Sequence, residues 1–228
     1  MKYKLKAFSL VEMILTLAIL SIVFLMLTKT LNTVVRVSAI TRYKTATRNE
    51  ADFIMELTER LLANSNIKDI YIYNSIDKTF NGDSFSTVDL AVYENELSMG
   101  TFGNEIHVQP YNFDSWTCIG FFKDPNYDDN NKAYVVKRSV LNMPDTTERH
   151  ASCFQGLALP NEPYIILNSD DISVNNFQVS YSQTFDQKNN LFYIDLVMEP
   201  LYWAPGETTI EKSIYRQSVI TTQGLTWY

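Results

Sequence analysis

An unbroken apolar run occupies the start of the chain. Phe8 to Leu27 form a 20-residue stretch whose only charged residue is Glu12. A helix of this length, at 1.5 Å per residue, spans about 30 Å, which is the thickness of the hydrocarbon core of a bilayer. No Ala-x-Ala cleavage site follows the run, as it would in a secretory signal peptide. The pattern therefore predicts a membrane-spanning helix that stays with the mature protein.

The polar sequence after this run continues the helix. Neither Pro nor Gly occurs between Lys29 and Ala63, and Asn64-Ser65-Asn66 is a cluster of helix breakers. Five apolar residues recur at the spacing of one helix face: Phe53, Ile54, Leu57, Leu61 and Leu62. One helix of about 80 Å is predicted from Phe8 to about Ala63. We expect its first half to be bare in a membrane or filament, and the Phe53–Leu62 face of its second half to lie on the head.

Beyond residue 66 the pattern changes to short β-branched and aromatic runs between polar turns. The predicted strands are Ile70–Tyr73, Val88–Tyr93, Ile119–Phe122, Ala133–Val136, Tyr164–Leu167, Phe177–Tyr181, Leu191–Val197 and Ser213–Ile220. The predicted turns are Asn81–Asp83, Asp186–Asn190 and Ala204–Gly206. Strands that follow a long helix predict an α+β fold with an antiparallel sheet. The expected division is a leader at 1–7, the membrane half of the helix at 8–28, its amphipathic half at 29–65 and a β-rich head at 66–228.

Charge orients this arrangement. The formal net charge is −7, yet Lys2, Lys4 and Lys6 all precede the apolar run. Without these three lysines, 16 Lys and Arg remain against 26 Asp and Glu, a formal charge of −10. Basic residues mark the cytoplasmic end of a membrane helix, so residues 1–7 are expected in the cytoplasm and the head outside it. The acidic head has no electrostatic footprint for nucleic acid, and no direct nucleic-acid binding is expected from it.

Glu12 is the anomaly within the apolar run. A carboxylate at the centre of a membrane helix costs about 2.5–3.5 kcal/mol on insertion scales, and less near an end. Ser9-Leu-Val-Glu12 fits a capping box, which would place Glu12 in the first helical turn at the level of the lipid headgroups. Judged by charge alone, a helix cap and a group that pairs with another subunit remain equal alternatives.

The residues around Glu12 carry a resemblance. Lys6-Ala7-Phe8-Ser9-Leu10-Val11-Glu12, after a basic leader, resembles the processing site of type IV prepilins and pseudopilins, which have class III signal peptides. The resemblance implies that prepilin peptidase cuts between Ala7 and Phe8 and that Phe8 becomes an N-methylated terminus. It also implies that the Glu12 carboxylate pairs with the terminal amino group of a neighbouring subunit, which compensates its charge in an apolar filament core. Ala7 departs from the glycine usual before the cut.

The C-terminal half has a second resemblance, of pattern and order alone. Asp171–Tyr181, the predicted strand Leu191–Val197 and the closing segment Tyr215–Ile220 resemble the end of the J-type minor pseudopilins of type II secretion. The chain is also longer than most major subunits of the family. The resemblance therefore implies a minor subunit rather than the abundant one.

Two cysteines, Cys118 and Cys153, both lie beyond the apolar run. In an oxidising compartment they would close a loop of about 36 residues, worth roughly 3–4 kcal/mol on the chain-entropy model. Two buried free thiols are the alternative, because a sequence does not show whether the pair meets. His107 and His150 have no ligand spacing to each other or to a cysteine, so no metal site is predicted from them.

An acidic loop offers a weak calcium candidate. Asp124, Asn126, Asp128 and Asn130 place oxygen ligands at every second position, as at the start of a calcium-binding loop. The motif lacks the glycine at its sixth position and the glutamate at its twelfth. A solvated acidic loop is the alternative, and no cofactor is otherwise expected. Nothing in the chain resembles a nucleophile elbow or a protease signature, so an enzyme is not expected.

Two functions follow from these patterns. The first is a minor pilin or pseudopilin that assembles into, primes or caps a type IV pilus or a type II secretion pseudopilus. Its partners would be prepilin peptidase, other pilins or pseudopilins, and the cytoplasmic membrane, in which it resides before assembly. The alternative is a single-span membrane protein with an extracytoplasmic binding head that forms no filaments, in which Glu12 is only a helix cap.

Overall fold

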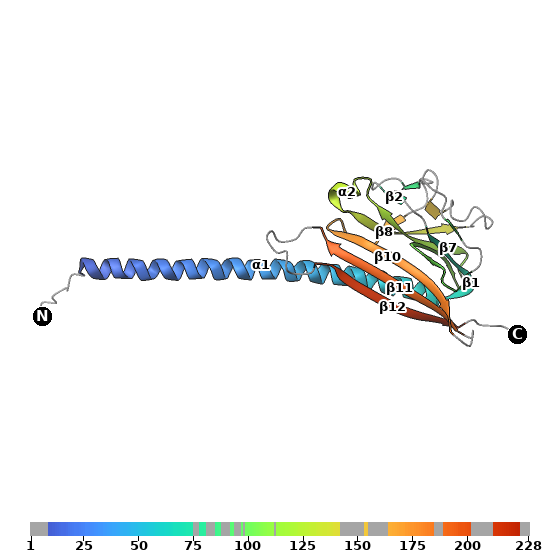
Figure 1. Cartoon of the computed structure of the whole chain (residues 1–228), viewed down its shortest axis with the longest axis horizontal. Coiled ribbons are helices and arrows are strands. Elements are labelled where there is room, and N and C mark those ends of the chain that lie inside the picture. Colours follow the sequence, from blue (N-terminus) through green and yellow to red (C-terminus); the bar gives the residue numbers. More distant parts are fainter. Residues whose placement is uncertain are drawn as a thin grey trace.

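One long helix and two β-sheets make up the part of the chain that the structure describes. The structure is a computed structural model, and it describes residues 9–74, 78–80, 85–87, 92–93, 97, 99–111, 113–141, 153–154, 164–184, 189–201 and 212–223. Figure 1 shows the helix projecting far from a compact β-rich head, with only its C-terminal part lying against the sheets.

The helix α1 (Leu10–Ala63) is continuous over 54 residues, as the sequence predicts. Ser9 caps its start, and Asn64 ends it by donating its backbone N–H to the carbonyl of Arg60 at 3.1 Å. The predicted first residue, Phe8, lies outside the described residues. The chain turns directly from Asn64 into a strand, so the helix and the head are joined without a linker.

The first sheet has eight strands. These are β1 (Ser65–Asn74), β2 (Lys78–Phe80), β3 (Phe85–Thr87), β4 (Val92–Tyr93), β6 (Glu105–Pro110), β7 (Ser115–Lys123), β8 (Ala133–Leu141) and β9 (Tyr164–Ile166). Its path runs β3-β2-β7-β6-β1-β4, while β8 pairs with β7 and with β9. A single helical turn, α2 (Tyr127–Asn130), stands between β7 and β8.

The second sheet has four strands in the order β12-β11-β10-β5. These are β5 (Phe102–Gly103), β10 (Ile172–Gln183), β11 (Asn189–Pro200) and β12 (Ile214–Gln223). Nearly all pairings in both sheets are antiparallel, and the exception is the parallel contact of β2 with β7 through Thr79 and Lys123. The predicted α+β fold with antiparallel sheets is confirmed.

Seven predicted strands coincide with strands of the head. Of the eighth, Val88–Tyr93, only the last two residues, which form β4, are among the described residues. Strands β2, β3, β5 and β6 are not among the predicted ones. The pattern conceals β6 because Glu105 and His107 look like the exposed face of an edge or loop and are in fact buried. The predicted turns at Asn81–Asp83 and Ala204–Gly206 lie outside the described residues. The turn predicted to extend to Asn190 is too long, because Asn189 and Asn190 already pair in β11.

The first sheet is buried on both faces. Successive apolar side chains along its strands point to opposite faces and pack in two separate clusters. Its inner face joins α1 and the second sheet in the main core, which includes Ile54, Leu62, Ile72, Ile119, Phe177 and Phe192. Its outer face carries a smaller cluster formed by Phe80, Cys118, Phe122, Tyr134, Val136, Val140, Cys153 and Phe154. The disulfide cysteines therefore belong to the outer cluster, away from the helix.

Candidate assembly surface and the cysteine–histidine cluster

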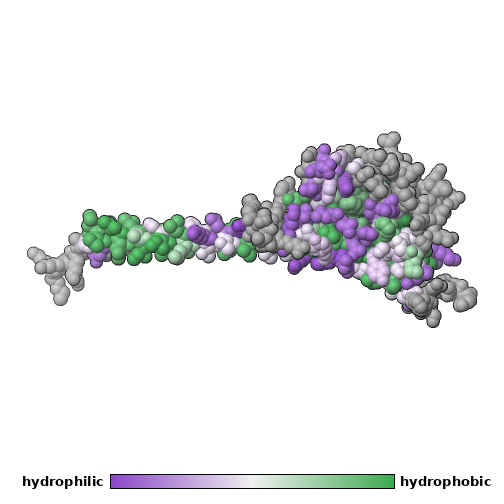
Figure 2. Space-filling model, viewed as in Figure 1, coloured by the Kyte–Doolittle hydropathy of each residue, from purple (hydrophilic) through white to green (hydrophobic). Residues whose placement is uncertain are grey.

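The N-terminal half of α1 has no partner within the described chain. Its large apolar side chains are exposed on every side: Leu10, Val11, Met13, Ile14, Leu15, Leu17, Ile19, Leu20, Ile22, Val23, Phe24, Leu25, Met26 and Leu27. Figure 2 shows this half as a continuous apolar rod beside a mixed, largely polar head. Such an all-round apolar helix is stable only when lipid or other helices surround it.

The small polar residues of this half are satisfied within the helix itself. Thr16 donates its hydroxyl to the carbonyl of Met13 at 2.9 Å, and Ser21 donates to Leu17 at 2.8 Å. Thr28 donates to the carbonyl of Phe24 at 3.0 Å in the same manner. These bonds remove the cost of placing hydroxyls in an apolar medium. Since residues 13–28 include no charged residue, Glu12 is the one charge that this rod carries.

Glu12 caps the helix in the structure. The backbone N–H of Ser9 donates to Glu12 Oε2 at 3.0 Å, and the backbone N–H of Glu12 donates to Ser9 Oγ at 3.3 Å. This is the reciprocal capping box expected from the spacing of the two residues. Glu12 therefore lies in the first turn, at the positive end of the helix dipole. The cleavage and methylation residues Ala7 and Phe8 lie outside the described residues, so these roles stay predictions.

The C-terminal half of α1 is held to the head by a buried stripe and by polar contacts. The buried residues are Ile40, Thr47, Ala51, Ile54, Met55, Thr58 and Leu62. The predicted face was right for Ile54 and Leu62 but wrong for Phe53, whose side chain is 53% exposed. The stripe includes small and hydroxyl residues that a hydrophobic pattern does not reveal, because Thr47 and Thr58 bond their hydroxyls to carbonyls of their own helix.

Two carboxylates of α1 fasten the helix to distant parts of the chain. Glu50 accepts a hydrogen bond from the backbone N–H of Ser169 at 3.0 Å, just before β10. Asp52 accepts two hydrogen bonds from the guanidinium of Arg216 on β12, at 2.5 and 3.4 Å. These bonds from Arg216 lower the pKa of the Asp52 carboxyl below its usual value. The helix thus contacts both the segment just before β10 and the edge strand β12.

A long apolar N-terminal helix, bare in its first half, packs its second half on antiparallel sheets. This is a pilin-like architecture. No protein-family model, curated protein or solved structure matches the chain, so the likeness rests on architecture. By length and composition α1 could be a membrane span or a signal sequence, and it alone passes that test among the described residues.

The structure joins Cys118 and Cys153 by a disulfide, with their Cα atoms 6.2 Å apart. Cys118 lies in the middle of β7, and Cys153 and its neighbour Phe154 are helical. Both cysteines are fully buried in the outer cluster. The disulfide therefore ties Cys153 to the outer face of the first sheet.

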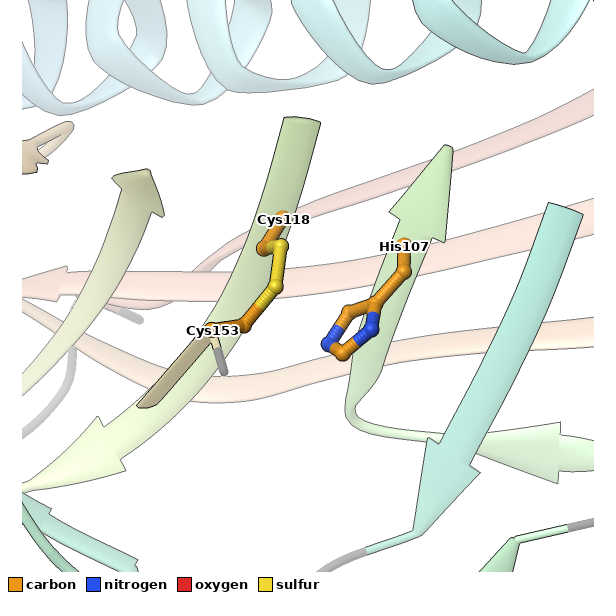
Figure 3. Close-up of side chains that lie close together, drawn as sticks. All are labelled: His107, Cys118 and Cys153. Atoms are coloured by element: carbon orange, nitrogen blue, oxygen red, sulfur yellow. A yellow bond between two sulfur atoms is a disulfide. The ribbon is translucent and has the colours of Figure 1, made fainter. Parts of the chain in front are cut away.

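His107 lies beside this disulfide (Figure 3). It is directly opposite Cys118 on the neighbouring strand β6, and ligand atoms of His107, Cys118 and Cys153 all lie within 4.8 Å of one another. Sequence spacing does not reveal this meeting, because strand pairing brings it about. The other histidine, His150, lies outside the described residues.

The calcium candidate occupies the turn between β7 and β8. Asp124 Oδ1 accepts the backbone N–H of Asn126 at 2.8 Å, and Asp124 Oδ2 accepts the hydroxyl of Tyr134 at 3.4 Å. Asp128 lies exposed within the helical turn α2, where residues two apart do not share a face. Asn130 ends that turn. The alternating spacing thus suits an extended loop better than the observed turn, and Asp124 already has partners of its own.

Proposed function

We propose that this chain is a minor pilin or pseudopilin subunit that assembles into, primes or caps a type IV pilus or a type II secretion pseudopilus. The observation that carries the proposal is the division of α1 into a bare apolar half and a packed half. The head takes structural and contact roles and is not an enzyme. The subunit resides in the cytoplasmic membrane with its head outside, until it enters a filament.

The bare half needs partners on all sides, which both lipid and a bundle of similar helices can supply. In a bilayer, about 20 apolar residues satisfy the hydrocarbon core. On extraction, the same side chains would be exposed to water unless the helices of neighbouring subunits covered them. Helix packing is therefore the assembly force that we propose, and other pilins or pseudopilins are its partners.

Glu12 would give this packing its register. A carboxylate has two oxygens and about four acceptor sites, and the capping bond to Ser9 occupies only one of them. The group can therefore cap its own helix and also meet the amino terminus of a neighbour. Prepilin peptidase would create that terminus by cutting after Ala7, and Phe8 would then be N-methylated.

The capping box also favours a second function. If Glu12 does nothing beyond capping, the chain is a single-span membrane protein whose extracytoplasmic head binds a partner without forming filaments. The two functions differ in what they require of Glu12, because an assembly group needs its negative charge and a cap needs only an acceptor oxygen.

Two substitutions separate these requirements. Glu12→Gln keeps an acceptor for the Ser9 N–H and removes the charge, whereas Ser9→Ala removes one capping bond and keeps the charge. Each variant would replace the native copy in the host, with Thr16→Val as the control within the same apolar half. Sheared filaments and membranes would then be compared by immunoblot at equal expression.

The proposal expects Glu12→Gln to fall to background in the filament fraction while remaining in the membrane, with Ser9→Ala and Thr16→Val close to wild type. Normal filament entry of Glu12→Gln would overturn the assembly role of the charge. Intact mass gives an independent test, since the mature chain should lack residues 1–7 and carry one methyl group. A mature chain that still begins at Met1 would rule out the filament function as a whole.

A further inference from the structure

The cluster beside the disulfide has the composition of a metal site. His107 Nδ1 or Nε2 and the two cysteine sulfurs lie within 4.8 Å of one another, and all three residues are fully buried. Two ligand atoms on one tetrahedral zinc ion lie about 3.5–3.8 Å apart, given bonds of 2.0–2.3 Å. Small side-chain movements would therefore bring the three ligands onto one ion once the sulfurs separate.

Glu105 provides the support that a metal-binding histidine needs. Its Oε1 lies 2.5 Å from His107 Nε2, and both side chains are fully buried. This bond favours the tautomer that holds the proton on Nε2, so Nδ1 carries the lone pair. Figure 3 shows Nε2 on the side of the ring that faces the sulfurs, so Nδ1 reaches them once the ring turns about its Cβ–Cγ bond. Metal-ligating histidines characteristically donate their other ring N–H to a carboxylate in this way. Glu105 is thus placed to orient the ring rather than to act as a ligand itself.

The charges around the cluster also fit a divalent cation. Arg138 lies opposite Cys118 on β8, is 3% exposed, and donates Nη1 to the carbonyl of Cys153 at 2.6 Å. Two thiolates alone would add two negative charges to this buried cluster, at a high desolvation cost. A divalent ion bound to both thiolates offsets those two charges.

We propose that the reduced protein binds one thiophilic divalent ion, of the zinc class, through Cys118 Sγ, Cys153 Sγ and His107 Nδ1. The two cysteines are thus either joined to each other in the disulfide or, when reduced, both bound to the metal. An external dithiol reduces the S–S bond by giving two electrons and two protons to the sulfurs of Cys118 and Cys153. The external dithiol is itself oxidised to a disulfide. The metal then displaces the two thiol protons into solution. Either the S–S bond or the metal would hold Cys153 to strand β7 of the first sheet.

Cobalt is the probe for this site, because tetrahedral thiolate coordination gives it strong visible and charge-transfer absorption. The full-length protein in detergent would be reduced with a phosphine under anaerobic conditions, freed of reductant and titrated with Co²⁺. Zinc would then be added to displace the cobalt. The oxidised protein is the control for ions bound elsewhere on the acidic head.

The expected result is one Co²⁺ per reduced chain with thiolate charge transfer, displaced by zinc, and none of this signal in the oxidised protein. His107→Gln and Cys118→Ser should abolish the tetrahedral signal, while His150→Gln, the matched change at the other histidine, should retain it. Glu105→Gln should keep the spectrum and weaken affinity about 10–100-fold, as expected for a positioning residue.

A second measurement, on the wild type alone, tests the site without depending on whether the variants fold. Zinc should slow alkylation of both thiols in the reduced protein and raise its melting temperature, and it should do neither in the oxidised protein. A reduced protein that unfolds and that zinc refolds would also support the site. Absence of thiolate charge transfer in the reduced wild type would overturn the proposal, as would a signal that survives His107→Gln but not His150→Gln.

Discussion

The two halves of α1 share one backbone and differ in what their apolar side chains contact. In the first half the large apolar side chains from Leu10 to Leu27 are exposed, whereas in the second half Ile54 and Leu62 are wholly buried against the head. Helix propensity and hydrogen bonding are continuous across both. One helix can therefore pack in two apolar environments: the core of its own chain, and a second one supplied by lipid or by other subunits. Substitutions in the two halves should therefore affect different measurements.

The largest expected difference comes from removing the same side chain in each half. Leu62→Ala should lower the free energy of unfolding of the head by about 2–5 kcal/mol, because it leaves a cavity in the main core. Leu25→Ala, at a side chain in the bare half that is 64% exposed, is the matched control and should change it little. Denaturant unfolding in detergent, followed by tryptophan fluorescence, measures both. Equal losses at the two positions would mean that the bare half belongs to the folding unit of the head.

A smaller contrast is expected for the threonines that bond to their own helix. The hydroxyl of Thr58 donates to the carbonyl of Ile54 at 2.8 Å in a buried site, and that of Thr33 donates to Lys29 at 3.0 Å in an exposed one. Thr58→Val should lower the free energy of unfolding by about 0.5–1.5 kcal/mol, the usual net worth of a buried hydrogen bond. Thr33→Val should be close to neutral in the same assay. If Thr58→Val left the free energy of unfolding unchanged, Thr58 would stabilise the fold through the packing of its methyl group alone.

The polar clamp between Asp52 and Arg216 should have a still smaller, pH-dependent effect. Asp52→Asn should cost about 0.2–1 kcal/mol at neutral pH, since the carboxylate is largely exposed. The hydrogen bond from Arg216 lowers the pKa of Asp52 in the folded protein, so its contribution is present above the usual value of 3.8 and is lost as pH falls through the lowered pKa. Stability measured from pH 7 to pH 2 should show wild type and Asp52→Asn converging only in strong acid. Convergence already at pH 6 would assign the effect to another group.

The smallest effect on the stability of the head is expected from deleting the apolar half of α1 altogether. A chain that begins at Lys29 lacks the apolar rod but keeps every buried residue of α1. Its head should melt at the same temperature as that of the full chain in the same detergent, because the deleted side chains that the structure describes, from Ser9 to Thr28, are exposed. Calorimetry of the two proteins checks this. A lower melting temperature of the shortened chain would show that the apolar half of α1 stabilises the head and that the two halves are not independent.

Local patterns predicted the elements well, because periodicity is a property of neighbouring residues. The apolar run, the helix end at Asn64 and seven strands follow directly from it. The pattern failed at β6 and at Phe53, where burial departs from local hydrophobicity. Glu105 and His107 are polar residues in a buried row, and Phe53 is an apolar residue on an exposed face. Such positions are fixed by what packs against them.

The sequence by itself determined that the chain has one charged residue in a 20-residue apolar run and a capping box at its start. Both features depend on residues within one helical turn of each other. Only the tertiary structure decided that the second half of α1 packs through Thr47, Ala51 and Thr58, and that His107 meets Cys118 and Cys153. Strand pairing and packing between elements bring together residues far apart in the chain, and no local pattern encodes that proximity.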